Sequence, residues 1–170
     1  MSNIYVLREL DKYGSITEAL NNLNASFSYR VLKSEVIEAN KQISTILKIP
    51  LGTKVFSYKK LRIVNDVAKT IEQVYIDYSR VNGIEKMNLK NQSLYAILQK
   101  SYNIEITYNE ENIRIVMAND EESRLLNLEP KTEVLISSGI TFANNNTIPF
   151  EYFEISAVHD FFRYRSITNI

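Results

Sequence analysis

The feature that most constrains the fold of this chain is an internal repeat. Residues 39–56 read ANKQISTILKIPLGTKVF, and residues 118–135, at an offset of 79 residues, read ANDEESRLLNLEPKTEVL. The correspondence extends beyond these stretches, since Glu72 falls on Glu151 at the same offset. Self-similarity at a fixed distance indicates that one supersecondary unit is used more than once. Two such units fit within 170 residues, a length typical of one domain with a sizeable core.

Each unit reads as helix, strand, helix, strand, turn and strand. The first unit's expected elements are a helix from Ser15, a strand at 27–39, a helix at 40–49 and strands at 54–64 and 69–78. The second unit's are a helix from Ser93, a strand region at 104–118 with a bend at 109–112, a helix at 119–128 and strands at 132–143 and 147–156. Asparagine-rich turns at 65–66 and 144–146 predict two antiparallel hairpins.

This order of elements predicts an α+β fold. We expect both units to share one antiparallel sheet, to be related by a pseudo-twofold axis, and to cover one face of the sheet with their helices. Ligand pockets favour internal interfaces of this kind. A site is therefore expected where equivalent elements of the two units converge.

Charge and cysteine content exclude several classes of function. The 20 Lys and Arg residues balance 20 Asp and Glu residues, whereas a domain that binds nucleic acid through phosphates is clearly basic. The absence of cysteine excludes disulfides, zinc thiolate sites and cysteine nucleophiles. With no long apolar run and no signal pattern at the N-terminus, we expect a cytoplasmic protein without a membrane partner, a metal or another cofactor.

Several short motifs follow one another along the chain in a characteristic order. They are S-Y-R-V-L at 28–32, G-T-x-V at 52–55, K-L-R at 60–62, T-I-E at 70–72, S-L-Y-A-I-L at 93–98 and N-T-I-P-F-E-Y at 146–152. Together with the two A-N-starting helices at 39 and 118, this order resembles the UTRA effector-binding domain of bacterial GntR-type regulators, in the HutC subfamily. The resemblance covers about residues 14–165.

The resemblance implies a chorismate-lyase-like α+β fold, a homodimer and a small-molecule effector, often a phosphosugar. In that family the effector domain follows a winged helix, which alone binds operator DNA and which this chain lacks. Residues 14–170 are then the effector-binding domain, and residues 1–13 the remnant of a linker. Alternatives are a chorismate-lyase-like enzyme on the same fold and a dimerisation module that binds no ligand.

Cationic and hydroxyl side chains point to an anion site. Lys60 and Arg62 lie at i and i+2 of a strand and so share one face, while Thr17 and Ser93 open equivalent helices. The resemblance matches the first two to a phosphate clamp and the last two to its hydroxyl ligands. Lysine stands where the family has arginine, and since it is a point charge without a bidentate fork, a carboxylate effector gains credibility. The structural alternatives are a solvated strand face and simple helix capping.

The remaining candidates are two glutamates and their neighbours. Glu72 and Glu151 lie at repeat-equivalent positions, and the resemblance places both at the polar end of the effector. Carboxylates accept hydrogen bonds from hydroxyl or ammonium groups. Tyr95 follows Ser93 closely, and Arg30 lies on the first strand, within reach of a pocket. The alternative to these ligand roles is that Glu72 and Glu151 face outward from their strands and that Arg30 is an ordinary surface residue.

Overall fold

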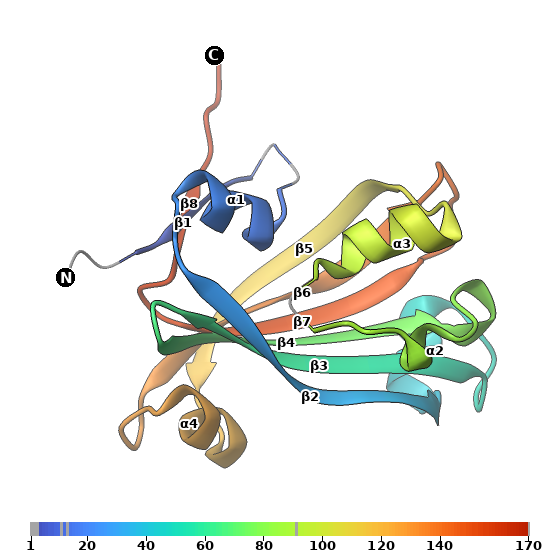
Figure 1. The fold of residues 1–170 in the computed structure, drawn as a ribbon, viewed down its shortest axis with the longest axis horizontal. Helices are drawn as coiled ribbons and strands as arrows, with labels where there is room; N and C mark the ends of the chain where they lie inside the picture. Colours follow the sequence, from blue (N-terminus) through green and yellow to red (C-terminus); the bar gives the residue numbers. More distant parts are fainter. Residues whose placement is uncertain (1–3, 11, 13, 91, 170) are drawn as a thin grey trace.

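The computed structural model describes residues 4–10, 12, 14–90 and 92–169, and its main feature is a six-stranded antiparallel sheet (Figure 1). The strands run in the order β2 (Phe27–Glu38), β3 (Lys54–Val64), β4 (Val67–Asp77), β7 (Glu151–Val158), β6 (Glu133–Ala143) and β5 (Ile106–Met117). The helices are α1 (Ile16–Asn22), α2 (Lys41–Leu47), α3 (Leu94–Tyr102) and α4 (Asp120–Leu126), with short 3₁₀ turns η1 (Tyr78–Arg80) and η2 (Ile84–Lys86). The predicted α+β class with an antiparallel sheet is confirmed. No helix in these described ranges is long and apolar enough to cross a membrane.

The strand registers follow the repeat in part. Glu38 pairs with Lys54 in the β2–β3 ladder, and Met117 pairs with Glu133 in the β5–β6 ladder, 79 residues later on both strands. The next ladders differ, because Lys60 pairs with Glu72 whereas Thr141, not Gly139, pairs with Glu151. The connection from β6 to β7 is longer than the two-residue turn between β3 and β4, which permits this shift of two positions. The pseudo-twofold relation of the units stays a prediction.

The four α-helices lie on both faces of the sheet, so the expectation that they cover one face is wrong. Along β3, Tyr58, Lys60 and Arg62 share one face, toward α1 and α3. Lys59 points to the other face, where it pairs with Glu121 of α4. Figure 1 shows α1 and α3 together above the sheet and α4 below it. The face under α1 and α3 carries the buried polar residues Lys60, Arg62 and Glu72.

The helix ends follow the local sequence. Asn119 caps α4 by accepting a hydrogen bond from the Glu122 N–H, and the Glu122 carboxylate accepts one from the Asn119 N–H, which forms a capping box. Asn40 caps α2 in the same position of the first unit. Both helices end in a left-handed residue, Lys48 or Asn127. The repeated A-N motif is therefore a helix start in each unit.

Strand β5 is continuous and pairs with β6 from Ile106 to Met117. Its irregularity lies between Ile106 and Tyr108, so the bend expected at 109–112 is not an interruption of the strand. At Gly139, the backbone of β6 lies close to the backbone of β5 at Glu110 and Glu111. A Cβ atom at Gly139 would lie 1.8 Å from the Glu110 carbonyl oxygen, so only glycine permits the two backbones to meet there.

The N-terminal segment takes part in the fold. Strand β1 (Val6–Glu9) pairs in parallel with β8 (Phe162–Arg165), a two-stranded sheet that the repeat does not predict. Val6 is buried in the same core cluster as residues of α1. Val6–Glu9 therefore belong to the folded domain, while positions 1–3, 11 and 13 lie outside the described residues. Whether the segment also connects to another domain stays a prediction.

Candidate functional site

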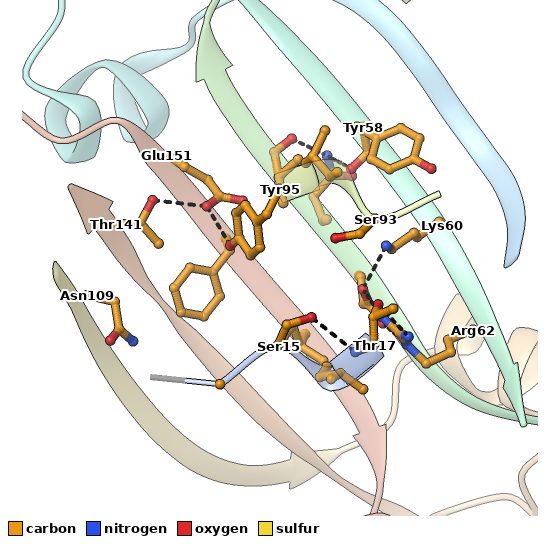
Figure 2. A pocket seen from close by; sticks show the side chains of 18 of the residues that line it. Ser15, Thr17, Tyr58, Lys60, Arg62, Ser93, Tyr95, Asn109, Thr141 and Glu151 are labelled. Atoms are coloured by element: carbon orange, nitrogen blue, oxygen red, sulfur yellow. Dashed lines mark hydrogen bonds and ion pairs between the residues drawn. The ribbon is translucent and has the colours of Figure 1, made fainter. Parts of the chain in front are cut away.

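A polar pocket lies between the sheet and the starts of α1 and α3 (Figure 2). It encloses about 730 Å³ of space including its mouth. Its floor comes from β3, β4, β6 and β7, so both units contribute. Of the eight residues predicted from the sequence, seven line it: Thr17, Lys60, Arg62, Glu72, Ser93, Tyr95 and Glu151. The structure therefore brings together residues that are up to 134 positions apart in the chain, from Thr17 to Glu151.

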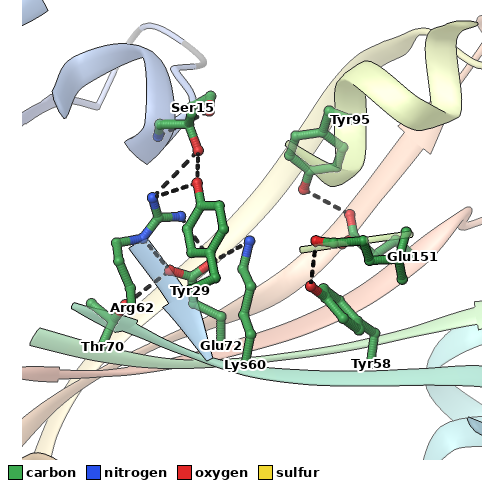
Figure 3. Close-up of polar contacts among 11 residues, drawn as sticks. Ser15, Tyr29, Tyr58, Lys60, Arg62, Thr70, Glu72, Tyr95 and Glu151 are labelled. Carbon is green, nitrogen blue, oxygen red and sulfur yellow. Dashed lines mark hydrogen bonds and ion pairs between the residues drawn. The ribbon is translucent and has the colours of Figure 1, made fainter. Parts of the chain in front are cut away.

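Arg62 and Glu72 form a buried bidentate ion pair. Arg62 Nε lies 2.6 Å from Glu72 Oε1, and Nη2 lies 3.1 Å from Oε2 (Figure 3). Arg62 Nη1 donates to the hydroxyls of Tyr29 and Thr17 at 3.0 and 3.3 Å. Burial alone would raise the pKa of Glu72, but the charges of Arg62 and Lys60 hold that pKa well below its usual range. Glu72 is consequently ionised at neutral pH.

Lys60 lies beside this pair with fewer contacts. Its ammonium lies 3.3 Å from Glu72 Oε2 and 4.2 Å from the centre of the Tyr29 ring. The side chain is buried, yet it lines the pocket. An ammonium has three N–H donors. The carboxylate oxygen of Glu72 and the ring of Tyr29 account for two of these donors.

Glu151 is buried without a basic partner in hydrogen-bond contact. Tyr95 OH and Thr141 Oγ1 both donate to Oε2, at 2.8 and 3.0 Å, while the buried Oε1 accepts no hydrogen bond. Burial raises the pKa of Glu151 to about 7, against the lowering effects of these hydrogen bonds and of Lys60. The group can therefore act either as a neutral donor or as an anionic acceptor near neutral pH.

The helix starts at the pocket differ in how they are capped. At α1, Ser15 Oγ accepts from the Thr17 N–H at 3.2 Å, so this hydroxyl is used locally. At α3, Ser93 is the N-cap residue but its side chain makes no capping hydrogen bond. Ser93 lines the cavity (Figure 2), so its hydroxyl is available to a ligand.

Arg30 is the predicted site residue that the pocket does not include. It lies on β2 opposite Leu61, and its side chain is exposed. Neighbouring strand residues point to opposite sides, and Tyr29 is the one that turns inward to contact Arg62. We therefore leave Arg30 out of the candidate site.

Sequence reasoning missed several polar residues of the pocket. The sequence also does not indicate Tyr29, which contacts Arg62 and Lys60 from outside the lining. The strand alternation around Ser28, Tyr29 and Arg30 does not show which side faces inward. Thr141 lies 79 residues after Arg62, so the repeat itself could have indicated it. Arg8 lines the pocket from β1 and pairs with Glu111 at 3.0 Å, but no signal in the sequence links these two. In the described part of the chain, no three His, Asp or Glu residues are grouped as a metal site would require.

The fold and this pocket together define a class of chorismate-lyase-like α+β domains. The sequence model of the UTRA domain matches residues 23–163, and the chain belongs to this family. The similarity to the effector-binding domains of GntR-type regulators, predicted from the motifs, is thereby confirmed.

Individual relatives agree with this assignment. The chain is similar to the uncharacterised HTH-type transcriptional regulator YurK of Bacillus subtilis, with 25% identity over 72% of this chain and 50% of that protein. It is also similar to the HTH-type transcriptional repressor NagR of the same organism, with 20% identity over 78% and 54%. It therefore spans about half the length of these relatives. The effector domain of PhnF from Mycobacterium smegmatis shares the fold, with a TM-score of 0.87, 18% identity and coverage of 97% and 100%.

Proposed function

We propose that this chain is the effector-sensing module of a bacterial transcription regulator of the GntR type, HutC subfamily. The effector is an anionic metabolite such as a phosphosugar or a carboxylate, held in the pocket between the two units. The observation that carries the proposal is the buried group of Lys60, Arg62 and Glu72, which faces Ser93 and Glu151 across one cavity. Buried charges of this density are costly to a fold unless they serve a ligand or a specific pairing.

The pocket has the parts that a small polar ligand needs. Lys60 and the uncapped start of α3 favour negative charge. Glu151 and Tyr95, at the other end, suit hydroxyl or ammonium groups. Phe153 and Ile155 supply an apolar surface between them. Such a mixture of convergent polar groups and apolar walls is typical of metabolite sites.

Coupling to DNA would run through the N-terminal segment. Thr17 opens α1, and Arg8 of β1 lines the same pocket. A ligand that contacts these residues would favour one position of β1 and α1, and so one arrangement of a winged helix joined before them. Because coupling is reciprocal, operator DNA must change effector affinity by the same factor. In a longer protein with that winged helix, an effector that leaves operator affinity unchanged would contradict this mechanism.

The binding proposal can be tested by thermal shift with phosphosugars, free sugars, amino acids and organic acids. A ligand at 100 times its dissociation constant adds about 2.7 kcal/mol to stability. The matched variant is Ser93→Ala, which removes a pocket hydroxyl that makes no capping bond. We expect a shift with at least one anionic compound and a smaller shift in the variant. Equal shifts in both proteins would place the ligand elsewhere.

Binding without catalysis is the expected outcome for chorismate and related substrates. Glu151 has a pKa suited to proton transfer, but its hydrogen-bond donors are the neutral hydroxyls of Tyr95 and Thr141. YurK and NagR, to which the chain is similar, are transcription regulators by name. Incubation with chorismate, followed by chromatography of the products, should show no turnover, and measurable lyase activity would favour the enzyme alternative.

We further propose that the module is a cytoplasmic homodimer formed at the β5 edge of the sheet. Ile113, Ile115 and Met117 are exposed along this strand, whereas β2 at the opposite edge exposes charged residues such as Lys33 and Glu35. Charges on an edge strand oppose pairing with another copy. Light scattering should give a dimer for the wild type and a monomer for Ile115→Arg. A dimer that binds none of the panel would favour the ligand-free dimerisation module.

A further inference from the structure

The cations of the pocket are almost fully matched by carboxylates of the protein itself. Arg8 pairs with Glu111 at 3.0 Å, and Arg62 pairs with Glu72 through two nitrogens. Lys60 shares Glu72 at 3.3 Å and has no carboxylate of its own. Arg8, Lys60, Arg62 and Glu72 line the pocket, and Glu111 lies outside the lining as the partner of Arg8. Among these described residues, the three cations thus exceed the two paired carboxylates by one charge.

Arg62 is not free to act as a phosphate clamp. All three of its guanidinium nitrogens already donate, to Glu72, Tyr29 and Thr17, and the side chain is 2% exposed. To turn the guanidinium to a ligand would leave Glu72 buried and without its main partner. An uncompensated buried charge is strongly unfavourable. Glu72 therefore occupies the place that a ligand anion would otherwise take.

Glu151 cannot raise the excess charge. This buried carboxyl is neutral when protonated and contributes one negative charge when ionised. The lining together with Glu111, the partner of Arg8, consequently carries a net charge of at most plus one. A ligand group with one negative charge beside Lys60 is balanced, whereas a group with two leaves an unpaired charge in a buried site.

We propose that Glu72 is a built-in counter-ion that restricts the anion position beside Lys60 and Ser93 to singly charged groups, so that the effector is a carboxylate and not a phosphate monoester dianion. This inference rests on the proposed function and specifies its ligand class. The rest of such a ligand would present hydroxyl groups, or one ammonium group, to Glu151. A hydroxylated acid and an amino acid are both compatible, depending on whether Glu151 is protonated.

The test compares two probes that differ in the anionic group. D-Glucuronate and D-glucose 6-phosphate carry a carboxylate or a phosphate at the same carbon, and glycerate and glycerol 3-phosphate form a second, smaller pair. Titration calorimetry at pH 8 ensures that the phosphate is a dianion, since its second pKa is about 6. The proteins are the wild type, Glu72→Gln and Glu121→Gln. The last variant makes the same charge change at a carboxylate that pairs with Lys59 on the other face of the sheet.

The proposal expects the wild type to bind the carboxylate of a pair at least about tenfold more tightly than the phosphate. Glu72→Gln should shift this ratio toward the phosphate by about tenfold or more, and Glu121→Gln should leave it unchanged. A wild type that prefers the phosphate, or a ratio that Glu72→Gln does not alter, would overturn the role of Glu72 while the sensor function stands. If no anion of either kind, nor any of the thermal-shift panel, binds any of the three proteins, the proposed function itself fails.

Discussion

Among the described residues of the pocket, two basic and two acidic side chains are buried, and they differ in their surroundings. Lys60, Arg62 and Glu72 stabilise one another, while Glu151 relies on two neutral hydroxyls. The charges of Arg62 and Lys60 lower the pKa of Glu72 and keep it ionised, whereas burial raises the pKa of Glu151 to about 7. Because some of these residues have charged partners and Glu151 has neutral ones, they contribute differently to the stability of the fold.

Arg62→Ala should destabilise the fold strongly. The substitution leaves Glu72 buried with only Lys60 and Thr70 as partners, and breaking one side of a buried ion pair costs about 3–5 kcal/mol. Urea denaturation gives the change in the free energy of unfolding. Arg30→Ala is the matched control, since Arg30 is exposed on the neighbouring strand and surface substitutions stay within about 0.5 kcal/mol. Equal effects of both substitutions would contradict the buried pairing.

The pKa of Glu151 predicts a pH dependence of stability with a definite sign. Its folded-state pKa is raised from 4.5 to about 7, so between these values the folded state binds more protons than the unfolded state. The free energy of unfolding must then fall with rising pH across this window, by up to about 1.4 kcal/mol per pH unit from this group. Glu72 acts oppositely, since its depressed pKa gives stability above pH 4.5 that is lost in more acidic solution.

Glu151→Gln isolates the contribution of this one carboxyl group. Glutamine keeps an acceptor for Tyr95 and Thr141 but does not titrate. Denaturation curves collected between pH 5 and 8 should show a flatter dependence for the variant than for the wild type. Parallel curves for the two proteins would show that Glu151 titrates near its ordinary value.

Among the elements, the repeated helix starts allow a direct comparison of capping. Asn119→Ala removes a hydrogen bond to the Glu122 N–H and disrupts the capping box of α4, which should cost about 1 kcal/mol. Ser93→Ala at the start of α3 removes no capping bond and should cost only a few tenths. Chemical denaturation measures both. A larger loss for Ser93→Ala would mean that its hydroxyl has a structural role.

Local patterns made most of these elements predictable. The strand at 54–64 and the Asn119 cap follow from β-branched residues, turn signals and an Asn three positions before a glutamate. The placement of helices on both faces did not follow, because α2 and α4 are short and their apolar residues fit either face. The pocket was partly predictable, since Lys60 and Arg62 share a strand face, but the inward side of β2 depends on how β2 pairs with β3.

At the scale of the whole molecule, the composition of the pocket depends on long-range pairing between strands, which no local sequence pattern predicts. The shift between the β3–β4 and β6–β7 registers places Glu151 opposite Thr141, although the repeat aligns it with Glu72. The parallel pairing of β1 with β8 joins the two ends of the described chain. Neither arrangement is encoded within a window of ten or twenty residues. Both nevertheless determine which side chains meet in the pocket.

Val6→Ala tests whether the N-terminal strand docks in solution. Val6 is buried at 2% exposure between β8 and α1, and loss of its methyl groups should cost about 1–2 kcal/mol. The neighbouring Leu7→Ala is the control, because Leu7 points outward and should stay within about 0.5 kcal/mol. Thermal and urea denaturation measure both changes. If neither substitution has an effect, residues 1–13 behave as a linker.

Gly139 affects the orientation in which a ligand can bind in the pocket. It stands 79 residues after Lys60 in the corresponding strand, and the Glu110 carbonyl leaves no room there for any side chain. A frame built from two like units would, if its lining were also alike, accept a molecule equally well in either direction. The backbone contact at Gly139 excludes a lysine at this position, so the second unit has no equivalent of Lys60 there. The two ends of the cavity therefore differ. On the proposed function, a ligand would therefore bind in one orientation, with its anionic end beside Lys60.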